Sequence, residues 1–149
     1  MRTNQKLLLV VAFLGVMTFV RVDAQQSEFR PPIMSNPEEV AVLNVVALRI
    51  AAYNAHNIES FVTAHAENVQ IYEFPEKKIG EGRAHLKRIF GPQFARGAGL
   101  IQVKGQFVIG DKVVSQELVT IDNVTERIIA IYTVENGVIN SVRLIESED

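Results

Sequence analysis

The chain has 149 residues, which corresponds to one domain, and its hydrophobic fraction of 48% and charged fraction of 21% are ordinary for a globular protein. A formal net charge of −2 provides no basic field for nucleic acid. The absence of cysteine from the sequence excludes disulfide bonds, thiol catalysis and zinc sites with cysteine ligands.

The first 24 residues have the pattern of a signal peptide. Arg2 and Lys6 precede an apolar run over residues 7–20, and residues 22–24 then space small side chains as a signal-peptidase site does. The run is shorter than the ~20 residues of a bilayer span, although an uncleaved membrane anchor is the alternative. We therefore expect an exported protein, periplasmic or secreted, with no membrane contact after cleavage.

The following residues predict an arm and then three helices. Residues 25–36 are polar and include two prolines, so we expect a flexible arm. Asn36 can cap a helix that begins at Pro37 and continues to about Asn54, because apolar residues recur there at helical spacing. Two shorter helices follow, one from Asn57 and one over residues 83–90 before a break at Gly91-Pro92.

Strand patterns dominate the rest of the chain. Residues 69–74 alternate in polarity, and from residue 100 the apolar period becomes two, with hairpin signals of which Asn136-Gly137 is the strongest. Helices followed by such hairpins indicate the α+β class with an antiparallel sheet. Several strands are apolar on both faces, so one face should carry the helices and the other should meet a second subunit. The later strands are expected at residues 101–103, 107–109, 113–119, 128–134 and 138–145, and a turn at residues 80–82.

No motif indicates a metal or cofactor site. The three histidines lack the spacing of metal ligands. The sequence Gly80-Glu81-Gly82-Arg83 lacks the third glycine of a dinucleotide-binding loop. We therefore expect neither a metal nor a cofactor.

A family resemblance begins in the first two predicted helices. The stretch from Ile50 to Phe61 resembles the first helical hairpin of SnoaL-like and steroid-isomerase-like proteins of the nuclear-transport-factor-2-like superfamily. Residues 66–69, 82–90 and 137–143 are similar to later family patterns. The resemblance implies that residues 37–149 form a cystatin-like cone, a curved antiparallel sheet wrapped around three N-terminal helices with a pocket at its open end. Members include isomerases, cyclases, dehydratases and epoxide hydrolases, and many only bind or scaffold.

The resemblance also implies a candidate catalytic base. It places the base of the steroid isomerases at Glu73, but it puts Arg49 and Ala130 where those enzymes have their two oxyanion donors. Arg49 and Tyr53 are four residues apart on one helix face. If Glu73 points into the cone, Arg49 faces it, either as part of a site or as a structural ion pair.

Four further side chains are candidates for the pocket, namely His65, Glu117, Tyr132 and Arg143. Tyr132 and Arg143 share a sheet face if Asn136-Gly137 is a two-residue turn. The simpler alternative for Glu117 and Arg143 is a cross-strand charge pair. His65 either lines the pocket or sits at a helix end with its charge solvated.

Three functions follow from these residues. The first is an exported small-molecule-binding protein with a polar-ended apolar pocket, whose ligand is small and hydrophobic or polar-ended, and which forms a homodimer. The second is an isomerase, dehydratase or hydrolase that uses Glu73 as general base. The third is an oligomeric interaction module.

Overall fold

A computed structural model describes residues 36–146 of the chain. The predicted signal peptide and the predicted arm up to residue 35 lie outside these residues. Within residues 36–146, no helix is both long and apolar enough to cross a membrane.

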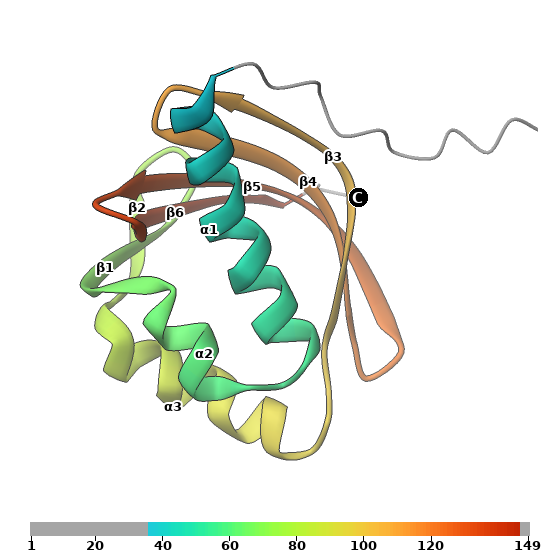
Figure 1. The fold of residues 1–149 in the computed structure, drawn as a ribbon. Coiled ribbons are helices and arrows are strands. Elements are labelled where there is room, and N and C mark those ends of the chain that lie inside the picture. Colours follow the sequence, from blue (N-terminus) through green and yellow to red (C-terminus); the bar gives the residue numbers. More distant parts are fainter. Residues whose placement is uncertain (1–35, 147–149) are drawn as a thin grey trace, which may run out of the picture.

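The fold is a curved sheet that wraps around one long helix, with two shorter helices closing the hollow (Figure 1). The six strands lie in the order β2-β1-β6-β5-β4-β3. The predicted α+β class and cone architecture are confirmed. One strand pairing, between β1 and β6, is parallel, so the sheet is mixed and not wholly antiparallel. The elements are α1 (Pro37–Asn54), α2 (Ile58–Thr63), β1 (His65–Glu73), β2 (Lys77–Glu81), α3 (Gly82–Ala95), β3 (Leu100–Ile109), β4 (Lys112–Ile121), β5 (Val124–Glu135) and β6 (Val138–Glu146).

Side-chain caps start the first two helices where the sequence predicts them. The Asn36 carboxamide oxygen accepts a hydrogen bond from the Glu38 backbone N–H at 3.0 Å, and Asn57 accepts one from Ser60 at 3.0 Å. Each cap satisfies an N–H that has no partner within its helix.

The third helix and the second strand differ from prediction. Helix α3 continues through Pro92 to Ala95 because Gln93 and Phe94 on its last turn are buried against the core. Strand β2 pairs with β1 over part of the predicted turn, and it was missed because most of its side chains are exposed and show no apolar alternation.

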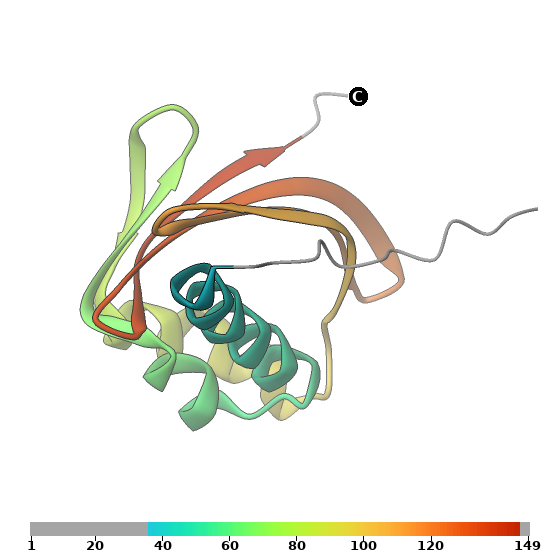
Figure 2. The same ribbon diagram turned by 45° about the horizontal axis from the view of Figure 1, so that its top comes forward.

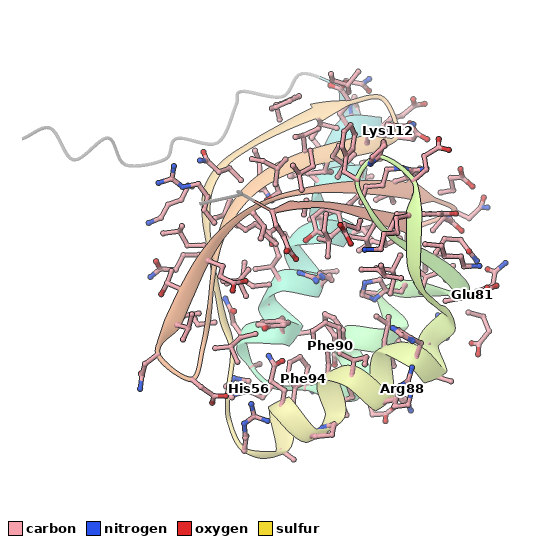
Figure 3. The ribbon with its side chains drawn as sticks, turned by 180° about the vertical axis from the view of Figure 1, so that it is seen from behind. His56, Glu81, Arg88, Phe90, Phe94 and Lys112 are labelled. Atoms are coloured by element: carbon pink, nitrogen blue, oxygen red, sulfur yellow. The ribbon has the colours of Figure 1, made fainter. Side chains whose placement is uncertain are left out.

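The core lies between the concave face of the sheet and the helices (Figure 2). Four aromatic rings from the three helices meet edge to face or tilted, with centres 4.9–6.0 Å apart, and they are Tyr53, Phe61, Phe90 and Phe94. Phe90 and Phe94 point from α3 into the interior, whereas Arg88 points outward (Figure 3). This cluster closes the end of the cone where the helices meet.

A β-bulge in β6 decides which side chains face the core. The turn at Asn136-Gly137 has two residues as predicted, and Val134 pairs with Ile139. The next pair is Thr133 with Ser141, so Asn140 is the extra residue. A slip of one residue moves every later side chain to the opposite face.

The predicted shared face of Tyr132 and Arg143 is therefore wrong. Tyr132 is opposite Val142, and Arg143 is opposite Ile131. Tyr132 is fully buried on the inner face, whereas Arg143 lies on the outer face with Tyr72.

Candidate functional site

Arg49 lies at the centre of the cone. Its position on α1 buries it to 8% exposure, and its guanidinium carbon lies 5.7 Å from the ring centre of Tyr53, 5.1 Å from Phe61 and 5.3 Å from Tyr132. Two of its nitrogens, Nε and Nη1, are buried and have no hydrogen-bond partner among the described residues. The aromatic faces stabilise the cation, but they provide the N–H donors of Nε and Nη1 with no conventional hydrogen-bond acceptor.

A buried carboxylate lies beside the same tyrosine. Glu117 on β4 is 1% exposed, and the Tyr132 hydroxyl donates a hydrogen bond to its Oε1 at 2.9 Å. Neither Arg49 nor Glu117 takes part in an ion pair among the described residues. The ring of Tyr132 thus contacts the cation with its face and the carboxylate with its hydroxyl.

The Tyr53 hydroxyl is held by a hydrogen bond from α3. The Gln93 side-chain amide donates a hydrogen bond to its hydroxyl oxygen at 2.6 Å. Burial is the main factor that raises the pKa of Tyr53, while the Gln93 bond and the charge of Arg49 oppose this rise. Burial is also the main factor that raises the pKa of Tyr132. Both phenols are therefore neutral at physiological pH.

His65 is a neutral member of the cluster. Burial first, and then the nearby charge of Arg49, lower its pKa to about 3. Its Nδ1 lies 2.8 Å from the Phe61 carbonyl oxygen. Because a carbonyl oxygen only accepts, Nδ1 carries the proton and Nε2 keeps its lone pair. The alternative of a solvated charge at a helix end is wrong, since the side chain is buried.

Glu73 does not reach this cluster, so the predicted contact with Arg49 is wrong. Its side chain is 49% exposed and forms an ion pair with Lys77 at 2.6 Å. The alternation of Val69 and Ile71 into the core is correct. Glu73 follows at the end of the strand, where the β1–β2 hairpin projects beyond the helices and leaves its side chain in solvent (Figure 2).

Arg143 also lies away from the cluster. Its guanidinium carbon lies 4.7 Å from the ring centre of Tyr72, and its Nη1 donates to the Ser141 hydroxyl at 3.2 Å. The alternative of a charge pair with Glu117 is wrong as well, because the two side chains are on opposite faces of the sheet.

The structure therefore brings together five of the seven predicted residues, namely Arg49, Tyr53, His65, Glu117 and Tyr132. It adds Gln93 and Ser115, two buried polar residues that the sequence analysis missed. Gln93 directly follows Gly91-Pro92, where the sequence predicts that the helix ends, so no periodicity indicates its burial. Within residues 36–146, no group of three or more His, Asp or Glu side chains could hold a metal ion.

Comparisons with known proteins support the fold. No family model matches the chain, and no curated protein matches it. A cystatin-fold protein from Novosphingobium aromaticivorans is similar in structure, with a TM-score of 0.65, 21% identity, and coverage of 70% of this chain and 97% of that one.

Two further solved structures carry names of enzymes. A putative ketosteroid isomerase from Kribbella flavida has a TM-score of 0.64 and 18% identity, and covers 75% of this chain and 82% of that one. SalBIII, an epoxide hydrolase/cyclase-like enzyme with a role in pyran ring formation in the polyether salinomycin, has a TM-score of 0.65 and 18% identity, over 74% of this chain and 93% of that one. At these identities the similarity concerns the fold, which is that of the nuclear-transport-factor-2-like and SnoaL-like proteins.

Proposed function

We propose that this chain is a small-molecule-binding protein whose site is centred on Arg49 inside the cone. The observation that carries the proposal is the buried guanidinium, whose Nε and Nη1 have no hydrogen-bond partner among residues 36–146. Burying a charged group without hydrogen bonds costs several kcal/mol. Cation–π contact with an aromatic ring offsets about 2 kcal/mol when the cation is desolvated. A polar ligand group on Arg49 would satisfy the remaining donors.

The surroundings of Arg49 indicate the rest of the ligand. Three buried aromatic rings flank the guanidinium, so its immediate surroundings are apolar. A small, largely apolar compound with one polar end complements such a site.

The geometry gives no support to an isomerase, dehydratase or hydrolase that uses Glu73 as general base. A base must lie within hydrogen-bond reach of the proton that it removes. Glu73 is paired with Lys77 on the projecting hairpin, away from the buried cluster. An isomerase, dehydratase or hydrolase would therefore have to use a general base other than Glu73.

Export and dimerisation belong to the same proposal. The signal-like pattern of residues 1–24 supports export, and N-terminal sequencing of the mature protein should then begin at Gln25. A mature protein that retains Met1 would contradict cleavage of a signal peptide.

The outer sheet face supports a homodimer, and it is also the surface that an interaction module would use. Phe107 and Ile109 on β3 are 51% and 66% exposed. A groove of about 320 Å³ on this face is lined by Gly105, Gln106, Phe107, Val114, Gln116 and Ile129. An apolar surface of this kind is typical of a contact between subunits. We expect the wild type to sediment as a dimer and the Phe107→Glu variant as a monomer. A wild type that sediments as a monomer would contradict the proposed dimer.

Binding can be tested with a library of small apolar compounds that each carry one polar group. We expect hits to raise the melting temperature of the wild type and of Glu73→Gln, because binding stabilises the folded state. The Arg49→Met variant should lose this response, and crystals with a hit should show its polar atom on Nε or Nη1 of Arg49. Hits that stabilise Arg49→Met as much as the wild type would refute the proposal.

A further inference from the structure

The charges inside the cone are already balanced. Arg49 contributes one positive charge. Glu117 contributes one negative charge as the carboxylate that accepts the hydrogen bond from the Tyr132 hydroxyl. His65 is neutral, with its Nδ1–H donated to the Phe61 carbonyl. A charged ligand would therefore leave this interior with an uncompensated charge, which is costly in a buried site.

Both charged groups have unused hydrogen-bonding capacity. In the part of the chain that the structure describes, Arg49 has no hydrogen-bond partner at Nε and Nη1. Glu117 receives a single hydrogen bond from the described residues, at Oε1 from Tyr132, whereas an ionised carboxylate offers about four acceptor positions. Among residues 36–146, Arg49 thus lacks an acceptor at these two nitrogens, and Glu117 has room for further donors.

We propose that the ligand is a neutral compound with a carbonyl oxygen that accepts from Arg49 and a hydroxyl group that donates to Glu117. This inference rests on the proposed binding function and names its ligand class. A simple ketone would leave Glu117 as it is, and a carboxylic acid would bring a second negative charge beside that carboxylate. A hydroxyketone satisfies both ends and keeps the interior neutral.

Three probes of similar size separate these possibilities, namely 2-hydroxyacetophenone, acetophenone and benzoate. Isothermal titration of the wild type should give the lowest Kd for 2-hydroxyacetophenone. Its Kd should be about tenfold below that of acetophenone, which is the effect of one hydrogen bond to a charged group. Benzoate should bind more weakly than the hydroxyketone.

The Glu117→Gln variant should favour the negatively charged probe that the wild type disfavours. Its interior keeps the cation of Arg49 without a compensating carboxylate, so benzoate should bind at least about tenfold more tightly than it binds the wild type. The matched carboxylate variant Glu73→Gln should keep the wild-type order. If Glu117→Gln does not fold by circular dichroism, the wild-type order of the three probes decides the inference.

The outcomes distinguish this inference from the proposal on which it rests. The wild type could instead bind benzoate or acetophenone most tightly, with this binding lost in Arg49→Met. That result would overturn the hydroxyketone inference and support the Arg49 site. Binding of none of the three probes would overturn the inference too, while library hits seated on Arg49 would still support the site. Equal binding of the probes to Arg49→Met and to the wild type would overturn both.

Discussion

The Tyr132 hydroxyl reaches Glu117 although the strand register places the two residues far apart. Tyr132 on β5 is opposite Val113 on β4, four residues before Glu117. The pair between them on the inner face is Ser115 with Ala130, and both are fully buried. Two small side chains leave room for the tyrosine ring to lie along the concave face, and the curvature of the sheet shortens the distance that it spans.

Removing the Tyr132 hydroxyl should destabilise the protein. Tyr132→Phe keeps the ring over Arg49 but takes away the hydrogen bond that Glu117 receives from the described residues. We expect a loss of about 1–3 kcal/mol in the free energy of unfolding, measured with urea. Tyr72→Phe is the matched control on the outer face, where the change should stay within about 0.5 kcal/mol. Equal losses in the two variants would contradict the role of the Tyr132–Glu117 bond.

Arg49 and Glu117 should be coupled in stability. Arg49→Met leaves a buried carboxylate without a compensating cation, and Glu117→Gln leaves the reverse. The double variant should lose at least about 1 kcal/mol less than the sum of the single variants. Urea unfolding of all four proteins measures this coupling. If the losses in the free energy of unfolding of the two single variants are additive in the double variant, the two charges do not interact.

His65 should make stability depend on pH. Its pKa of about 3 in the folded protein lies below the value of 6.5 that is usual for histidine. Between these values the unfolded chain binds a proton that the folded protein does not, so stability is fully present above pH 6.5 and falls as the pH approaches 3.

The slope of that fall tests the burial of His65. The free energy of unfolding should decrease by up to about 1.4 kcal/mol per pH unit from this residue. His65→Gln removes the titrating group and should flatten the slope in urea unfolding series between pH 7 and pH 4. A variant with the wild-type slope would be inconsistent with a buried neutral His65.

Position 99 requires glycine because of its backbone conformation and because of the side chains beside it. Its φ is +104°, and a Cβ there would lie 2.4 Å from Gln93 Nε2 and 2.7 Å from the Tyr53 hydroxyl, both on buried side chains. Gly97 has a φ of +67°, and a Cβ there would have no atom of residues 36–146 within 4 Å. Gly97→Ala should cost about 1–2 kcal/mol for its backbone conformation alone. Gly99→Ala should lower the melting temperature clearly more, and an equal effect would exclude the contribution of the clash.

Local signals made much of this fold predictable. The caps Asn36 and Asn57 and the turn at Asn136-Gly137 act within a few residues, so the sequence shows them directly. The spacing of Arg49 and Tyr53 on one helix likewise places both in the site without knowledge of the sheet.

The wrong predictions concern features that depend on distant parts of the chain. The position of Glu73 depends on where the helices stop covering the sheet, which no pattern within β1 encodes. The orientation of Arg143 depends on a bulge at Asn140, which lacks a glycine or proline to mark it. The parallel pairing of β1 with β6 joins segments about seventy residues apart, such as Ile71 and Val142, and is beyond any local signal.

That pairing also affects how the protein is made. Among the strands that the structure describes, the hairpin of β1 and β2 joins the rest of the sheet through β6 alone, and β6 is the last of them to be synthesised. A nascent chain cannot complete the sheet until residues 138–146 have left the ribosome, because β6, which joins β1 to β5, does not exist before then. Contacts so distant in sequence slow folding, so the early segments must wait for β6 before the aromatic and charged interior can close.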